Sequence, residues 1–252
     1  MKIIKWEILA GAFLVVLTVI LTWLHYVIFK DAKTLFFYVM EDIVFLPIQV
    51  LLVTLVLQGL LSLREKRAML QKLYMVIEVF FSEVGASLLK HLFEFDHKID
   101  GLRAELKNLN QWTDREFQIC QKKIKGLEMD VSCQYGDLEL LRSFLMSKRN
   151  FMLRLLENPN LLEHETFTEL LWAVFHLSEE LGHRKSCHEL CEADRGHFAN
   201  DIKRAYVLLI YEWLGYMRHL KANYPYLFSL ASRLNPFDPE AKAEIGSGFS
   251  EF

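Results

Sequence analysis

The longest apolar stretches of this chain lie near its amino terminus, at residues 8–28 and 43–63. A membrane core of ~30 Å needs about 20 apolar residues in a helix, and each stretch supplies that length. After residue 63, charged residues recur every few positions and no apolar run is as long. The pattern therefore predicts an all-α protein, in which a two-helix transmembrane hairpin over residues 1–63 continues into a cytoplasmic helical bundle.

The second predicted span should run on as a stalk helix over residues 64–95, because no Gly or Pro occurs between Leu63 and Gly85. The lower part of this stalk is apolar almost all round, so it needs neighbours on several sides. The folded domain supplies one side, and a second copy of the chain is the simplest source of the other. The apolar positions are Leu73, Met75, Val76, Ile77, Val79, Phe80, Phe81 and Val84.

Residues 96–239 are predicted to form the helical domain. Thr113 with Glu116, and Thr166 with Glu169, match the capping-box pattern that opens a helix. Apolar positions at spacings of three and four predict packed helices of the bundle type. Further helices are expected at residues 97–109, 113–127 and 137–157 and around the stripe Ile202, Tyr206, Leu209, Trp213, Tyr216 and Leu220. Residues 240–252 resemble a flexible linker.

The first apolar stretch is predicted to be a membrane anchor rather than a cleaved signal peptide. It is longer than the apolar region of a signal peptide, and no small-x-small cleavage site follows before Lys30. Basic residues lie just before the first predicted span and just after the second, so the positive-inside rule places both termini in the cytoplasm. These residues are Lys2, Lys5, Arg64, Lys66, Arg67 and Lys72.

Charge argues against a nucleic-acid partner. The chain has 29 Lys and Arg against 32 Asp and Glu, and residues 1–63 carry four of each sign, so the soluble part is mildly acidic. A cytoplasmic domain keeps its thiols reduced, so the four cysteines are either packed or metal ligands. No phosphate loop, nucleophile elbow or kinase motif is present, which leaves an enzyme without positive support.

One face of the second predicted span carries Pro47, Leu51, Thr54 and Gln58, which recur at spacings of four, three and four, and Thr54 and Gln58 are polar. Polar side chains at that depth face protein or water rather than lipid. This face therefore contacts the first helix or a neighbouring subunit, or it lines a water-filled path. In an oligomer, Glu41 and Asp42 would form an acidic ring at the outer mouth and favour cations.

A second candidate site is a run of metal-ligand residue types at spacings of four, three and four. Imidazole, carboxylate and thiolate on one helix face can converge on zinc or another transition metal. The alternative is the polar margin of an amphipathic helix, with Gly182 ending that helix before the thiols line up. The run comprises His176, Glu180, His183, Cys187 and Cys191, with His188, Glu192, Asp194 and His197 nearby.

A di-iron carboxylate site of the bundle type is a third possibility, since such sites use two Glu-x-x-His pairs and two further glutamates. The matching residues are Glu94 with His97, Glu180 with His183, and the single acids Glu139 and Glu212.

Four stretches, residues 35–61, 80–85, 155–181 and 223–239, resemble a family of bacterial and archaeal inner-membrane proteins with two spans and a cytoplasmic helical domain. The resemblance implies a multi-pass protein of the inner membrane. It implies no activity, no cofactor and no site residues.

Three hypotheses follow for function. The first is a non-enzymatic homo-oligomer in the bilayer, either an assembly or a pore lined by the second span. The second is a membrane-tethered metal or redox protein that uses the His176 to His197 region. The third is a membrane-anchored scaffold that docks a soluble partner protein, whose identity the sequence does not indicate.

Overall fold

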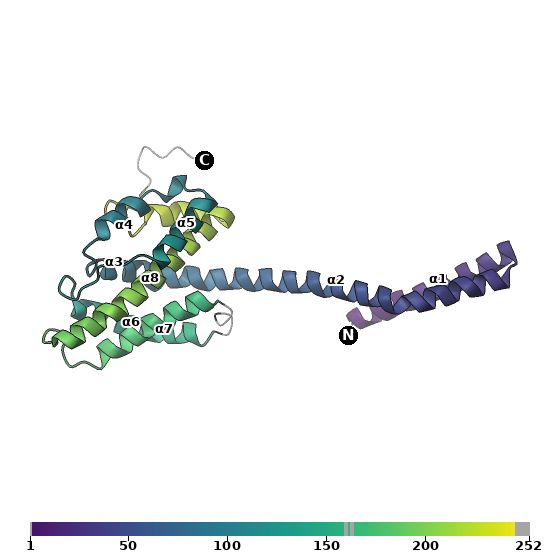
Figure 1. Cartoon of the computed structure of the whole chain (residues 1–252), viewed down its shortest axis with the longest axis horizontal. Coiled ribbons are helices and arrows are strands. Elements are labelled where there is room, and N and C mark those ends of the chain that lie inside the picture. Colours follow the sequence, from purple (N-terminus) through teal and green to yellow (C-terminus); the bar gives the residue numbers. More distant parts are fainter. Residues whose placement is uncertain (1, 159–160, 162–163, 245–252) are drawn as a thin grey trace. The chain divides into compact units, whose positions relative to one another are not determined.

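A computed structural model describes residues 2–158, 161 and 164–244, apart from the side chains of residues 2–8, 10, 29, 67 and 68. The chain divides into two compact units, Met1–Lys66 and Arg67–Phe252. The described residues form helices and no strand, with one isolated bridge between Asp96 and Val131 (Figure 1). The all-helical prediction is thus confirmed. The side chains of Lys2 and Lys5 and the tail from residue 245 lie outside the described residues.

The helices follow the predicted order closely. They are α1 (Lys2–Phe29), α2 (Ala32–Phe80), a π turn (Phe81–Gly85), α3 (Ala86–Phe93), α4 (Ile99–Leu106), a 3₁₀ turn (Leu109–Gln111), α5 (Asp114–Lys125), α6 (Leu138–Leu156), α7 (Glu165–Gly182), α8 (Glu192–Asn223) and α9 (Pro225–Arg233).

The first unit contains α1 and the beginning of α2, and the chain reverses direction between them at Lys30 and Asp31 (Figure 1). Lys30 has a positive φ of 50°, which breaks the helix. The carboxylate of Asp31 then accepts hydrogen bonds from the backbone N–H groups of Lys33 at 3.0 Å and Thr34 at 3.2 Å. Such a cap satisfies N–H groups that the first turn of a helix leaves free, so α2 begins at once.

The start of α2 differs from the predicted start of the second span at residue 43. Because the helix already begins at Ala32, Glu41 and Asp42 lie inside it rather than at its start. The Asp31 cap starts the helix, and no Gly or Pro occurs between residue 32 and Pro47, which α2 accommodates in its interior.

Two described segments are long and apolar enough to cross a membrane, judged by length and composition. One is Gly11–Ile28, and the other lies within Ala32–Phe93. Their apolar windows have mean hydropathies of 2.1 and 2.3, and none of either window is buried within the structure. At 1.5 Å per residue, the 28 residues of α1 extend over about 42 Å.

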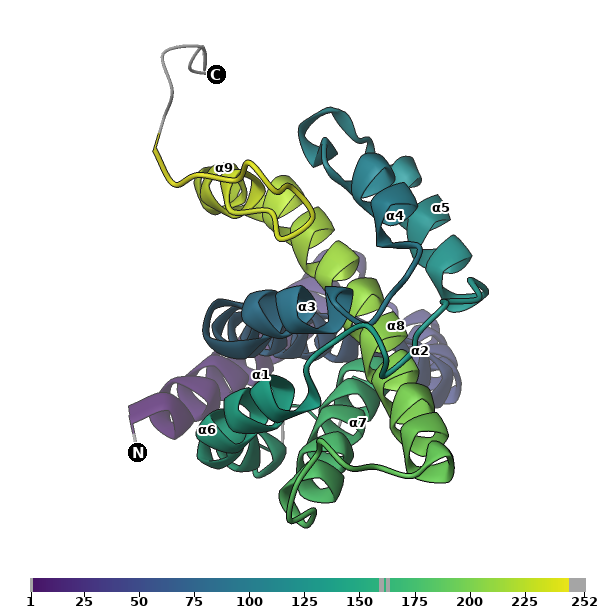
Figure 2. The ribbon, with the colours of Figure 1, turned by 90° about the vertical axis from the view of Figure 1, so that its left-hand side faces the viewer.

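The second unit is built around α8, which contacts α3, α5, α7 and α9 (Figure 2). The expected stripe of α8 faces the core: Tyr206, Leu209, Trp213 and Leu220 are each at most 2% exposed, while Tyr216 is partly buried. A helix with neighbours on several sides needs apolar residues on more than one face. Accordingly, Ile210, Leu214 and Met217 are also buried.

A π turn separates α2 from α3 within the predicted stalk. It brings the consecutive residues Phe80 and Phe81 into the core together, where Phe80 meets Phe167 edge-on at 5.3 Å and Phe81 stacks on Tyr216 at 5.1 Å. Gly85 permits this arrangement, because a Cβ atom there would lie 2.5 Å from the Phe81 ring. A π turn adds one residue to a helical turn and so rotates the next side chains to a new face.

The predicted all-round enclosure of the stalk is only partly supplied by the domain. Leu73, Ile77 and Phe80 are at most 1% exposed, whereas Met75 is 57% and Val79 is 47% exposed. This part of α2 therefore has one face in the core of the second unit and an apolar face open to its surroundings.

One capping prediction is confirmed and the other is wrong. Thr113 and Glu116 form the full capping box at the start of α5. The start of α7 is capped instead by His164, whose Nδ1 accepts from the backbone N–H of Phe167 at 3.1 Å. The cap of α7 thus lies two residues before the predicted cap at Thr166, because an imidazole nitrogen replaces the hydroxyl oxygen that the pattern assumes.

Candidate metal centre

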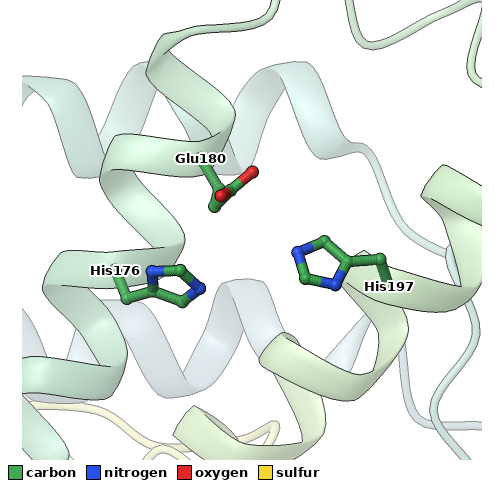
Figure 3. A group of neighbouring side chains, drawn as sticks. All are labelled: His176, Glu180 and His197. Carbon is green, nitrogen blue, oxygen red and sulfur yellow. The ribbon is translucent and has the colours of Figure 1, made fainter.

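The candidate centre lies between two neighbouring helices of the second unit, and each helix contributes two residues spaced by four. His176 and Glu180 come from α7, and His197 and Asp201 come from α8. Residues four apart share one face of a helix, so both side chains of each pair can point toward the opposite helix. Figure 3 shows the two imidazole rings turned toward each other beneath the carboxylate of Glu180.

The ligand-type atoms of three of these residues, His176, Glu180 and His197, are close enough to share one ion. Single donor atoms of His176, Glu180 and His197 all lie within 4.8 Å of one another. The Oδ2 atom of Asp201 lies 3.5 Å from Nε2 of His176 and 3.2 Å from Nε2 of His197. In a tetrahedral zinc site with bonds of 2.0–2.1 Å, neighbouring donors are separated by about 3.3–3.4 Å. Both measured separations are near that value.

Asp201 is the unusual member of this group. Its side chain is 4% exposed, and its Oδ2 atom is buried without accepting a hydrogen bond from any described residue. The imidazole nitrogens are near it but not in hydrogen-bonding geometry, and Arg204 Nη1 is 3.7 Å from the other oxygen. A buried carboxylate oxygen is costly unless a cation or a donor meets it, so this atom depends on a positive charge in the centre.

The other three side chains leave the centre open to solvent on one side. The imidazoles of His176 and His197 are each 48% exposed, and the Glu180 side chain is 34% exposed. Glu180 also lies 3.6 Å from Arg184, a contact of a kind worth only ~0–1 kcal/mol. Arg184 is held more closely by Asp194, at 2.9 Å, so Glu180 can turn toward an ion without leaving that arginine unpaired.

Without an ion, His176 and His197 are each within ion-pair distance of the Asp201 carboxylate. A metal centre at the same place needs unprotonated imidazole nitrogens as ligands, so metal binding there depends on pH.

The predicted thiol ligands lie elsewhere. Gly182 ends α7, so the spacing of four, three and four does not continue beyond it. His183 Nδ1 lies 2.7 Å from the carbonyl oxygen of Glu179. Cys187 donates its backbone N–H to Glu139 at 3.3 Å, and burial raises the pKa of its thiol, which disfavours the thiolate that a metal requires.

Cys191 has a structural role instead. It occupies the N-cap position of α8, where its sulfur accepts from the backbone N–H of Asp194 at 3.5 Å. Of the predicted run, the structure therefore brings together His176 and Glu180, adds His197 from the surrounding residues, and leaves His183, Cys187 and Cys191 outside. Asp201 was not anticipated, although the four-residue spacing from His197 is a signal that could have identified it.

The predicted di-iron ligands do not converge in the described part of the chain. His97 stacks on Tyr135 at 5.0 Å, Glu139 pairs with Arg142 at 2.8 Å, and Glu212 is buried on α8. Among the described residues, His176, Glu180 and His197 are the three metal-ligand side chains that lie close enough together to hold an ion.

The predicted polar face of the second span lies on α2, where Glu41, Asp42, Pro47, Thr54 and Gln58 are all exposed. The hydroxyl of Thr54 donates to the carbonyl oxygen of Val50 at 2.7 Å. Its hydrogen-bonding need is thus met within its own helix, so Thr54 does not require water or a partner helix.

These features define a class of all-helical proteins in which two apolar amino-terminal helices precede a helical domain with a candidate metal centre. The chain belongs to the family of the uncharacterized protein MJ1433. The model of that family's N-terminal helical domain matches residues 2–61, and the model of its C-terminal helical domain matches residues 69–233.

Uncharacterized protein MJ1433 of Methanocaldococcus jannaschii is 41% identical to this chain over 234 residues, which are 93% of this chain and 94% of the relative. No solved structure matches the chain. The expected resemblance to a helical family is confirmed, and the family's domain division agrees with the division of the structure at Lys66.

Proposed function

We propose that this protein is a membrane-anchored metal-binding protein. Its helical domain binds one divalent first-row transition metal between α7 and α8, through His176, Glu180, His197 and Asp201. The observation that carries the proposal is the buried Oδ2 atom of Asp201, which lies 3.2 and 3.5 Å from two imidazole nitrogens and accepts no hydrogen bond from a described residue.

The four proposed ligand side chains match the ligand preferences of a divalent first-row transition metal. Two imidazoles and two carboxylates suit zinc or ferrous iron better than calcium or magnesium, which prefer oxygen ligands alone. An ion held there would link α7 to α8 and stabilise the folded domain. At a free metal concentration 100 times the dissociation constant, that stabilisation is about 2.7 kcal/mol.

Calorimetric titration of metal-free full-length protein in detergent with Zn²⁺ tests this proposal. We expect one equivalent to bind to the wild-type chain, and we expect His176→Ala and His197→Ala each to weaken binding at least tenfold. His188→Ala is the matched control, because His188 is an exposed histidine of the loop between the two helices. Equal loss in all three variants, or no effect in any, would show that zinc binds elsewhere.

The proposal includes a location in the inner membrane, with a two-helix hairpin and both termini in the cytoplasm. The two apolar segments support it, since their side chains are exposed and would otherwise present a large apolar surface to water. Labelling of single cysteines in intact cells is the test. A cysteine introduced at Lys30 should react with a membrane-impermeant maleimide, and one introduced at Glu244 should react only after lysis.

A second candidate function is a homo-oligomeric membrane assembly. The supporting observation is the exposed pair Met75 and Val79, which gives the lower part of α2 an apolar face that the second unit leaves uncovered. Light scattering in detergent should then report more than one chain per particle. Ion flux through reconstituted liposomes separates a pore from a closed assembly, and a monomer without flux would favour the docking scaffold.

A further inference from the structure

A polar cavity of about 330 Å³ lies in the second unit and shares no residue with the metal centre. Its walls come from the second half of α8, from α5, from the start of α7 and from Tyr74 of α2. The residues that matter below are Tyr74, His164, Tyr211, Glu212, Arg218 and His219. A concave site in which several polar groups converge is the usual form of a small-molecule site.

Glu212 places a buried acid in this cavity. It is 4% exposed, and its Oε1 atom is buried and accepts no hydrogen bond from a described residue. Burial raises the pKa of the carboxyl group, while Thr166, His164 and Lys125 act in the opposite direction. A carboxylate in this position is stabilised by a cation that enters the cavity.

The cationic side chains near Glu212 have other partners. Arg218 makes a paired contact with Asp114, with one hydrogen bond of 3.1 Å and a second, shorter one. The ammonium group of Lys125 lies over the ring of Tyr211, 4.4 Å from its centroid. His164 accepts the backbone N–H of Phe167 at Nδ1 to cap α7. The structure thus leaves one oxygen of Glu212 for a positive group from outside.

Aromatic rings form another wall of the cavity. Tyr74 and His219 stack with centroids 3.5 Å apart and planes within 6°. Burial lowers the pKa of His219, so its ring is neutral at pH 7 and does not repel a cation. Aromatic faces attract ammonium groups, and the stacked pair also offers a flat surface for a ring of the ligand.

We propose that this cavity binds a small organic amine, whose ammonium group pairs with Glu212 and whose apolar part lies against Tyr74 and Tyr211. An anionic ligand is disfavoured, because Glu212 and Asp114 both line the cavity and Arg218 is already paired. The proposal is independent of the metal centre.

The test uses benzylamine as the probe, with benzyl alcohol and benzoate as ligands of similar shape and different charge. Each is titrated calorimetrically into full-length protein in detergent, after subtraction of a titration into protein-free micelles. We expect saturable binding of one benzylamine per chain, at least tenfold tighter than binding of either control ligand. No saturable binding, or equal binding of benzyl alcohol, would overturn the proposal without the use of any variant.

Variants then locate the site. Glu212→Gln keeps the shape of the side chain and removes its charge, and it should weaken benzylamine binding at least tenfold. Glu128→Gln, at an exposed glutamate outside this cavity, should leave binding unchanged. Tyr74→Leu should weaken binding without abolishing it. Unchanged affinity in Glu212→Gln, or equal loss in Glu128→Gln, would refute the assignment of Glu212 as the amine partner.

Discussion

Asn235 joins the end of the helical domain to α4, and its replacement should destabilise the domain substantially. The side chain is fully buried. Its amide nitrogen donates to the carbonyl oxygens of Leu106 at 2.8 Å and Lys107 at 3.1 Å, and its amide oxygen accepts from the backbone N–H of Phe237 at 2.9 Å. The two carbonyls stand at the end of α4, where the last carbonyl oxygens of a helix have no N–H donor within the helix.

The magnitude follows from the groups that Asn235→Ala would leave unpaired. The Leu106 carbonyl and the Phe237 N–H lie in buried surroundings, whereas the Lys107 carbonyl is partly accessible and can turn to water. Each buried group without a partner costs about 1–3 kcal/mol, so we expect a loss of ~3 kcal/mol in the free energy of unfolding.

Urea unfolding of the full-length protein in detergent, followed by circular dichroism, measures this loss. Asn235→Asp is the more specific variant. Its carboxylate still accepts from the backbone N–H of Phe237, but its other oxygen faces the carbonyl oxygens of Leu106 and Lys107 and cannot donate to them. It should be at least as destabilising as alanine at pH 7. Asn200→Ala, at an exposed site on α8, is the control and should change stability by less than about 0.5 kcal/mol. If Asn235→Asp were as stable as the wild type, the donor role of the amide would be refuted.

Two further predictions concern packing and the thiols. Gly85→Ala should lower the free energy of unfolding by about 1–3 kcal/mol in a thermal or urea denaturation experiment, because its Cβ would lie 2.5 Å from the Phe81 ring. Gly101→Ala, where no atom lies within 4 Å of the new Cβ, is the control and should not destabilise the protein. Burial raises the pKa of both Cys120 and Cys133 to about 11, so mass spectrometry after brief iodoacetamide treatment at pH 7.5 should find the exposed Cys191 modified before either of them. Rapid modification of Cys120 in the folded protein would contradict its placement in the core.

Much of the helical layout could be predicted from apolar spacing and caps. The stripe of α8 and the Thr113 cap of α5 are local features, because each depends on residues within a few positions of one another. The start of α2 and the cap of α7 differ from the prediction for a local reason as well, because Asp31 caps α2 and a histidine replaces the usual hydroxyl at position 164.

The candidate centre could be predicted only in part, since it depends on how two helices face each other. Periodicity along α7 indicated His176 and Glu180, but it also extended past Gly182 to thiols that belong to a loop and to the next helix. The candidate residues across the interface, His197 and Asp201, come from a separate helix. The sequence names His197 only as a residue near the run and does not single out Asp201, because no spacing along α7 reveals which residues of α8 lie opposite it.

X-ray absorption at the zinc edge, on full-length protein loaded with one equivalent of Zn²⁺, tests the central claim most directly. The account predicts a first shell of nitrogen and oxygen at ~2.0–2.1 Å, with the outer-shell scattering of two imidazoles. Sulfur at ~2.3 Å would contradict it, because the ion would then lie at Cys187 or Cys191 rather than at the group of His176, His197 and Asp201.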